Sequence, residues 1–436
     1  MSSSSWMHHR RSIPGSRIFY RGEKEESENL GFQCSSNCPH FEELTTLEDV
    51  PSFGAEYKEQ VKYYLFQDLD KTEYLKIINN VKFLSCGRSH TFLITNNNEC
   101  FVCGYNAYMQ CGFIPSHSKL TSIVNGSHEL TVPYLSKVNL HDALNPLIEK
   151  GEIEANYEIT HACCGWVHSV VIVDSKIIIG AGHNFFHQLG HPRGGSFDHF
   201  EIIPFDPEIE TPNYVITHVD GGTFFTVICL NSRVLYGAGS SSTCNFGSQD
   251  KYTSLEFNKV HEFDCDVAKI QCGYDHTMVL LKDNRIFAVG KLPGASSQLN
   301  EYTLITSVPH SPFDRVDIAV SKFNYPSYIL VNDILYTLRD TQAEVMVQQK
   351  SLIGASLHTT NTHMFVINRD RTSIVYSTLD TLGHFSAPQG FYFSEISGGY
   401  TACYAVVKPK IAIGYFIRLK NAYLHARVSD IMIVCH

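Results

Sequence analysis

The sequence has no long apolar run and a low content of charged residues. No stretch approaches the roughly 18 consecutive apolar residues that a membrane-spanning helix needs. Charged residues make up 18% and hydrophobic residues 43% of the chain, which is typical of a globular protein rather than a disordered one. The composition therefore predicts a folded protein that does not enter a membrane.

Basic residues are outnumbered by acidic ones. The chain has 34 Lys and Arg against 44 Asp and Glu, which gives a formal net charge of −10. Binding to a nucleic-acid backbone requires concentrated Lys and Arg that displace counterions. The only basic cluster without an acid is formed by Arg10, Arg11, Arg17 and Arg21. The composition argues against direct nucleic-acid binding.

The N-terminal segment lacks the apolar core of a secretory signal. It has arginines and serines but no acid before Glu23, as mitochondrial transit peptides do, yet we interpret residues 1–16 as a flexible basic tail. The 14 cysteines are scattered and show no regular disulfide framework. We therefore expect reduced thiols and a cytoplasmic or nuclear location.

Four segments of the chain align with one another without gaps. In each, a first glycine at position i is followed by a second glycine at i+17, and in three a histidine occupies i+3. The first glycines are Gly87, Gly165, Gly222 and Gly273, the second are Gly104, Gly182, Gly239 and Gly290, and the histidines are His90, His168 and His276. A third glycine occupies i+25 in three segments, at Gly112, Gly190 and Gly247. The chain is therefore built from repeats.

Two short apolar runs lie between the two glycines of each repeat, separated by a polar turn such as KDNR at 282–285. Nearly continuous apolar runs of this length indicate a hairpin of two strands that are covered on both faces. Glycines at fixed positions indicate close backbone approach or a positive φ, where a Cβ would clash. We expect the histidines to be structural and to bind backbone groups within their own repeat.

Two further copies keep the paired strands but have lost the glycines. Ser321 takes the first-glycine position in one copy, and Leu338 occupies the second-glycine position at i+17. Thr360 takes the first position in the other copy, which has Ser377 at i+17 and retains the histidine as His363.

A seventh copy begins at Gly399 and then breaks off. Residues 17–32, which include Gly22, match its missing second half. Propellers often share one blade between the two ends of the chain, because this removes exposed sheet edges. The sequence therefore predicts an all-β, seven-bladed β-propeller with four-stranded blades, the last of them closed by the N- and C-terminal strands.

The arrangement G-x-x-H, a hydrophobic hairpin ending in G, and then G-x-N-x-x-x-Q-L-G resembles the repeat of the regulator of chromosome condensation (RCC1) family. The fullest match is residues 164–190, which include Asn184, Gln188 and Leu189. The resemblance covers residues 17–407 and implies a non-catalytic scaffold that binds a protein partner through its loops, without a cofactor. The founding member of the family exchanges guanine nucleotide on a small GTPase. Exchange on a Ran-like GTPase is therefore the alternative function.

The first-glycine positions come progressively closer together along the chain, from the interval between Gly87 and Gly165 to the much shorter one between Ser321 and Thr360. The early repeats therefore carry insertions, which are residues 36–80 and 114–158. Loops of this length in a compact domain are usually functional or disordered. Because the loops diverge from the family, no partner-contact residue can be transferred.

Three groups of His and Cys have spacings that metal ligands adopt. They are His183, His187 and His191; Cys100 and Cys103; and Cys34, Cys38 and His40. The first group follows a strand in a turn, the second lies within a strand, and the third lacks a fourth ligand, so we predict no metal. Catalytic motifs such as a P-loop or a nucleophile elbow do not occur in the sequence, and we predict that the protein is not an enzyme.

Residues 408–436 differ in character from the repeats. The segment VSDIMIVCH at 428–436 resembles the first strand of a BTB/POZ domain, which implies the truncated start of such a domain. The propeller would then be the substrate-recruiting arm of a cullin-type ubiquitin ligase. The alternative is an ordinary strand packed on the propeller.

Overall fold

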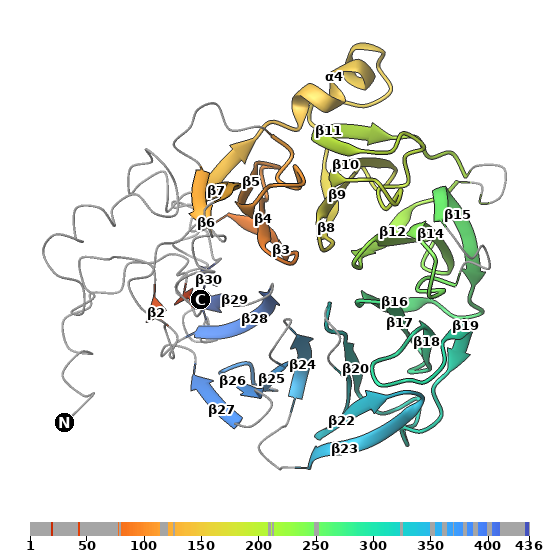
Figure 1. The fold of residues 1–436 in the computed structure, drawn as a ribbon. Helices are drawn as coiled ribbons and strands as arrows, with labels where there is room; N and C mark the ends of the chain where they lie inside the picture. The colour runs from red at the N-terminus through yellow and green to blue at the C-terminus, as the bar shows by residue number, and fades with distance from the viewer. Residues whose placement is uncertain are drawn as a thin grey trace, which may run out of the picture.

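The computed structural model describes most of the chain from residue 80 onwards. The described residues are 19–20, 42–43, 77, 80–113, 121–124, 127–207, 211, 213–247, 253–322, 326–348, 354–359, 364–368, 370–377, 382–386, 391–398, 403–409 and 432–435. Their strands form antiparallel sheets that are arranged around a ring (Figure 1).

Five of the sheets have four strands each, in chain order across the sheet. They are β8 (Ile159–Cys164), β9 (His168–Val173), β10 (Ile177–His183) and β11 (Ser196–Ile203); β12 (Ile216–Gly221), β13 (Phe225–Leu230), β14 (Val234–Ser240) and β15 (Thr253–Glu262); β16 (Val267–Cys272), β17 (His276–Leu281), β18 (Ile286–Gly290) and β19 (Leu299–Leu304); β20 (Val316–Ala319), β21 (Ser327–Val331), β22 (Ile334–Arg339) and β23 (Gln342–Gln348); and β24 (Gly354–Thr359), β25 (Met364–Asn368), β26 (Ser373–Ser377) and β27 (Leu382–Ser386).

The sheet before these has five strands, β3 (Val81–Cys86), β4 (His90–Thr95), β5 (Cys100–Tyr105), β6 (Thr121–Val124) and β7 (Ser127–Val138). The sheet after them has three, β28 (Phe391–Gly398), β29 (Cys403–Pro409) and β30 (Met432–Cys435). The first strands of successive sheets lie side by side around the ring, and β28 lies beside β3 (Figure 1).

The N-terminal strands pair differently from the sequence prediction. β1 (Phe19–Tyr20) pairs with β2 (Glu42–Glu43), whereas the strand that pairs with β29 is β30. The prediction that the N-terminal segment completes the last blade is therefore wrong for the described residues, although β1 lies close to β29 and β30. Residue 22 and most of the segment 17–32 lie outside the described residues.

Part of the expected insertion at 114–158 belongs to the repeat itself. β7 pairs with β5 and supplies the fourth strand of its sheet, with Cys100 opposite Val138. The helix α4 (His141–Glu149) follows and buries Leu144 against the neighbouring core. Among the described residues, no helix combines the length and the apolar character that crossing a membrane requires.

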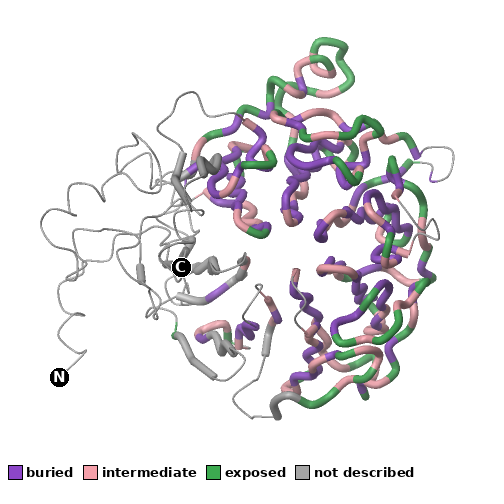
Figure 2. Tube along the Cα trace, viewed as in Figure 1, coloured by how far each residue is buried: buried purple, intermediate pink, exposed green. Residues whose placement is uncertain are grey.

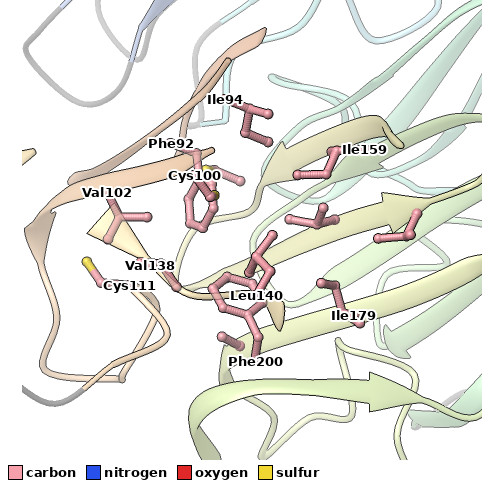
Figure 3. Close-up of a cluster of buried hydrophobic side chains, with 14 of the residues drawn as sticks. Phe92, Ile94, Cys100, Val102, Cys111, Val138, Leu140, Ile159, Ile179 and Phe200 are labelled. Atoms are coloured by element: carbon pink, nitrogen blue, oxygen red, sulfur yellow. The ribbon is translucent and has the colours of Figure 1, made fainter. Parts of the chain in front are cut away.

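The core lies between the faces of neighbouring sheets, and burial is most complete in second strands such as β9, β13 and β17 (Figure 2). One cluster joins Phe92 and Val102 of the first sheet to Ile179 and Phe200 of the next (Figure 3). Similar clusters fill the following sheet-to-sheet interfaces. Each sheet therefore depends on its neighbours to bury its faces, as in other repeat architectures.

The first glycine of a repeat makes room for the ring that follows three residues later. A Cβ on Gly87 would lie 2.2 Å from the His90 ring, and one on Gly165 would lie 2.0 Å from the His168 ring. At Gly222 the ring is that of Phe225, at 2.1 Å.

The second glycines have positive φ, from 93° at Gly290 to 113° at Gly239. At each of them the pairing of the third and fourth strands shifts register. Leu338 and Ser377 take this position in the later copies, and there the pairing continues without a shift. The hairpin survives the loss of the glycine because only the bulge requires it.

The three repeat histidines that the structure describes, His90, His168 and His276, each bind the next sheet. His90 Nε2 lies 2.9 Å from Ser169 Oγ, and Ser169 Oγ donates to the Gln110 carbonyl at 2.8 Å. His168 Nε2 lies 2.8 Å from Thr226 Oγ1, which donates to a carbonyl in the same way. Since these hydroxyl protons point to carbonyls, the imidazoles donate from Nε2. The expectation that the histidines bind backbone within their own repeat is wrong.

Burial lowers the pKa of these histidines. The pKa falls to about 3 at His90 and His276, and well below its usual range at His168. His276 makes the corresponding bond to Ser327 Oγ at 2.7 Å. His363 lies outside the described residues.

We predict that acid destabilises the protein through these histidines. An unfolded chain takes up protons below about pH 6.5, whereas the folded chain does so only near pH 3 at His90 and His276. Stability is therefore complete above pH 7, and each histidine removes about 1.4 kcal/mol per pH unit as the pH falls further. Urea unfolding at pH 7.5, 6.5 and 5.5 measures the slope. His276→Gln should reduce that slope, and an unchanged slope would contradict the assignment.

We predict that Thr226→Val destabilises the ring by about 2 kcal/mol, because it leaves His168 Nε2 and the Gln188 carbonyl buried without a partner. The measurement is the free energy of unfolding at pH 7.5. Thr303→Val on β19 is the matched control, since Thr303 binds only a nearby exposed carbonyl. Equal effects of the two substitutions would refute a special role for the bond between sheets.

Candidate functional site

Two sets of loops define the two faces of the ring. In each four-stranded antiparallel sheet, the connections from first to second strand and from third to fourth strand lie at one end. The hairpin between the second and third strands, and the passage to the next sheet, lie at the other. We call the first end the strip face and the second the opposite face.

Tight turns between the third and fourth strands hold aromatic side chains on the strip face. In the turn after β10, Asn184 Oδ1 accepts from Leu189 N at 2.9 Å, and Gln188 Oε1 accepts from Phe186 N at 3.2 Å. His187 has a φ of 57°, and Phe185 and Phe186 lie just before it, 65% and 42% exposed. The motif identified in the sequence therefore fixes the backbone that displays these two rings.

The turn after β5 repeats this construction. Asn106 Oδ1 accepts from Cys111 N at 2.8 Å, and Gln110 Oε1 accepts from Tyr108 N at 3.1 Å. Tyr108 is 41% exposed.

A continuous row of rings runs from these turns to the loops between first and second strands. Centroids lie 5.2 Å apart for Tyr108 and His183, 5.8 Å for His183 and Phe224, and 4.8 Å for Phe186 and Phe224. Trp166 stacks on Phe224 at 5.8 Å and lies 5.2 Å from Tyr274. We call this row the aromatic strip, and it consists of Tyr105, Tyr108, Trp166, His183, Phe185, Phe186, Phe224 and Tyr274.

Two cations lie beside the segment that carries Trp166. The Arg88 guanidinium lies 4.8 Å from the Trp166 ring, a cation–π contact. Lys322 Nζ donates to the Cys164 carbonyl and lies 3.5 Å from Asp220 Oδ1. Burial disfavours the Lys322 ammonium, but Asp220 and the facing thiols outweigh this and raise the pKa of Lys322.

Asp220 itself joins two sheets. Its Oδ2 accepts from Cys272 N at 2.7 Å, and its Oδ1 accepts from Gly221 N at 2.9 Å. Lys322 therefore ties its own loop to the first strands of two other sheets, and holds the strip face together near the ring centre.

The two faces differ in charge. The described loops of the strip face carry four cations, Arg88, Arg193, Lys291 and Lys322, against Asp275 and Asp340. Burial raises the pKa of Asp275, and Arg193 is paired with Glu201 at 2.6 Å. The described loops of the opposite face, with α4, carry fourteen Asp and Glu against seven Lys and Arg.

The His and Cys groups considered as metal ligands have other contacts. His183 Nδ1 binds Gln188 Nε2 at 2.6 Å, and His187 Nδ1 binds the His191 carbonyl at 3.0 Å. Cys100 and Cys103 are buried in β5. No group of three or more metal-ligating side chains occurs in the part of the chain that the structure describes, which does not include Cys34, Cys38 and His40.

The ten cysteines from Cys86 to Cys272 are free thiols. Burial is the main cause that raises the pKa of Cys86 to about 12 and of Cys164 to about 11, so both remain protonated. Cys272 precedes Gly273 at the same repeat position and is also buried. Gly399 lies outside the described residues.

Sequence analysis missed the aromatic strip. Arg88, Trp166, Tyr274 and Lys322 all follow a first-glycine position directly, so the repeat alignment already placed them in equivalent loops. That signal was available, but the contact between rings from different sheets depends on how the ring brings the loops together.

Comparison with known proteins agrees with this architecture. The family model for the Regulator of chromosome condensation (RCC1) repeat matches residues 81–110 and 267–291. The Ultraviolet-B receptor UVR8 of Arabidopsis thaliana is 24% identical over 50% of this chain and 42% of its own length. An RCC1 repeat-containing protein of Dictyostelium discoideum is 26% identical over 38% of this chain and 36% of its own length. The chain thus spans less than half of these relatives.

Solved structures share the fold along most of the chain. Human WBSCR16 has a TM-score of 0.63 at 11% identity, over 91% of this chain and 99% of its own. Prp20p of Saccharomyces cerevisiae has a TM-score of 0.64 at 13% identity, over 95% and 96%. Together with the repeat glycines and the sheets in a ring, these similarities identify the chain as an RCC1-like β-propeller.

Proposed function

We propose that this protein is a non-catalytic scaffold that binds a protein partner through its strip face. The aromatic strip is the observation that carries the proposal. Aromatic residues and Arg are enriched among the side chains that dominate protein–protein binding energy. Rigid turns hold Tyr108, Phe185 and Phe186 in place, which lowers the entropy lost on binding.

The proposed ring has seven blades. The five four-stranded sheets, the β3–β7 sheet and the β28–β30 sheet support this number, as does the position of β28 beside β3. A closed ring would give the loops of the strip face a fixed spacing.

Guanine-nucleotide exchange is the alternative. Prp20p has a structure described with its binding properties to Gsp1p and histones, and a further structure shows Kap60 bound to Prp20. At 13% identity this similarity concerns the fold, so exchange on a small GTPase rests on the family alone. The role as a substrate-recruiting arm in ubiquitination rests only on the resemblance of residues 428–436 to a BTB strand. The free thiols support a cytoplasmic or nuclear location.

We predict that the double substitution Phe185→Ser and Phe186→Ser removes most partner binding. Pull-down from cell extract, quantified by mass spectrometry, should show at least a fivefold loss of the proteins captured by the wild type. Phe313→Ser is the matched control, since Phe313 is 98% exposed and lies between β19 and β20 on the opposite face. Both variants should unfold within about 0.5 kcal/mol of the wild type. Equal capture by the wild type, the double variant and Phe313→Ser would rule out the strip as the binding site.

We predict that nucleotide does not release the partner. The protein is used as bait with EDTA, which strips Mg²⁺ and nucleotide from GTPases, and the column is then eluted with GTP. An exchange factor holds its GTPase tightly only without nucleotide. A small GTPase released specifically by GTP would therefore replace the scaffold proposal with exchange activity.

A further inference from the structure

The aromatic strip carries no charge of its own, which limits the partner that it fits, provided that the strip binds a protein as proposed above. Burial lowers the pKa of His183, so its ring is neutral at pH 7 like the others. The four cations in the described loops of this face each have a partner. They are Arg193 with Glu201 at 2.6 Å, Lys322 with Asp220 at 3.5 Å, Lys291 with the nearby Asp275, and Arg88 with the Trp166 ring at 4.8 Å. A charged ligand group would lose its hydration here without gaining an unpaired counter-ion from these loops, so the strip suits an uncharged segment.

The turns that carry the strip use their own backbone N–H groups internally. In the turn after β10, the His187 N–H donates to the Asn184 carbonyl at 3.0 Å, and the Phe186 N–H donates to Gln188 Oε1 at 3.2 Å. The turn after β5 repeats these two bonds. Addition of a ligand strand requires a row of backbone donors and acceptors that a sheet edge offers and these turns do not. The ligand therefore has either an α-helix, which pairs its own backbone, or a polyproline II helix, whose backbone is solvated.

The exposed rings project from the turns instead of lining a groove. Phe185 is 65% exposed, and Phe186 and Tyr108 are 42% and 41% exposed. An amphipathic α-helix is recognised by a groove that covers its apolar face. In a polyproline II helix, residues two apart lie about 6 Å apart along the axis. Ring centroids lie 5.2 Å apart for Tyr108 and His183 and 4.8 Å apart for Phe186 and Phe224, so neighbouring prolines of such a helix can each contact a ring.

Hydroxyl groups border the rings. The turn after β14 aligns with the turn after β10, with Gly239 matching Gly182, and it has Ser242 at the position of Phe185. Ser242 is exposed, and Tyr108 adds a phenolic hydroxyl to the same face. A proline-rich chain has backbone carbonyls but lacks the N–H groups of its prolines. It therefore binds best to a surface that combines apolar rings with hydroxyl donors.

We infer that the aromatic strip binds an uncharged, proline-rich segment of a partner protein in the polyproline II conformation. The prolines contact the rings of Tyr108, Phe185 and Phe186, and the hydroxyls of Tyr108 and Ser242 donate to carbonyls of the segment. Because such a segment is already ordered before it binds, little entropy is lost on binding.

The test measures fluorescence anisotropy of labelled twelve-residue peptides with capped ends, using the full chain. The first peptide repeats Pro-Pro-Leu, and the second repeats Ala-Gln-Leu, an uncharged helix former. The third and fourth have Glu or Lys in place of the leucines of the first. The Pro-Pro-Leu peptide should bind at least tenfold more tightly than the Ala-Gln-Leu peptide and at least threefold more tightly than the charged ones. Its affinity should change less than twofold between 50 and 500 mM salt.

Two pairs of variants locate the binding. Phe185→Ser should weaken binding of the Pro-Pro-Leu peptide about tenfold, and Phe313→Ser on the opposite face should leave it unchanged. Tyr108→Phe keeps the ring but removes the hydroxyl, and should weaken binding about threefold. Tyr157→Phe, between α4 and β8 on the opposite face, should have no effect.

The outcomes separate this inference from the proposed function. If the Ala-Gln-Leu peptide binds as tightly and depends on Phe185, the strip is a binding site but the polyproline assignment is wrong. Tighter binding of either charged peptide overturns the preference for an uncharged segment. If the Pro-Pro-Leu peptide shows no binding that depends on Phe185, the inference fails, while the pull-down with the double variant still decides whether the strip binds a protein.

Discussion

The hydrogen bond from a buried neutral imidazole to a hydroxyl of the next sheet is the interaction on which the ring depends. It recurs from His90 to Ser169, from His168 to Thr226 and from His276 to Ser327. In the first two, the hydroxyl in turn donates a hydrogen bond to a carbonyl in the turn of the preceding sheet. The bond therefore fixes both the angle between neighbouring sheets and the position of that turn.

The same geometry connects the core to the surface. The turns whose carbonyls accept these protons include Gln110 and Gln188, and the side chains of these two glutamines brace the backbone below Tyr108 and Phe186. The neutral histidines between the sheets are thus connected, through these turns, to the exposed rings. Lys322 adds a second tie near the centre, because its ammonium binds groups from two other sheets.

The two faces have been separated in chemistry as well as in space. The strip face carries the aromatic rings, and the opposite face carries twice as many carboxylates as cations in its described loops. A propeller makes such a division easy, since alternate loops of every sheet project to opposite faces.

The sequence by itself determined the repeat, the paired strands and the glycine positions. These depend on local requirements: a glycine where an imidazole such as His90 lies against the backbone, a positive φ at a bulge, and apolar runs in covered strands. Tertiary structure decided what joins different sheets. The partner of His90 lies 79 residues away, the ring contact of Trp166 with Tyr274 crosses repeats, and β30 takes the place expected for the N-terminal segment. Such pairings follow from how the sheets close into a ring, and the residue spacing within one repeat does not determine that closure.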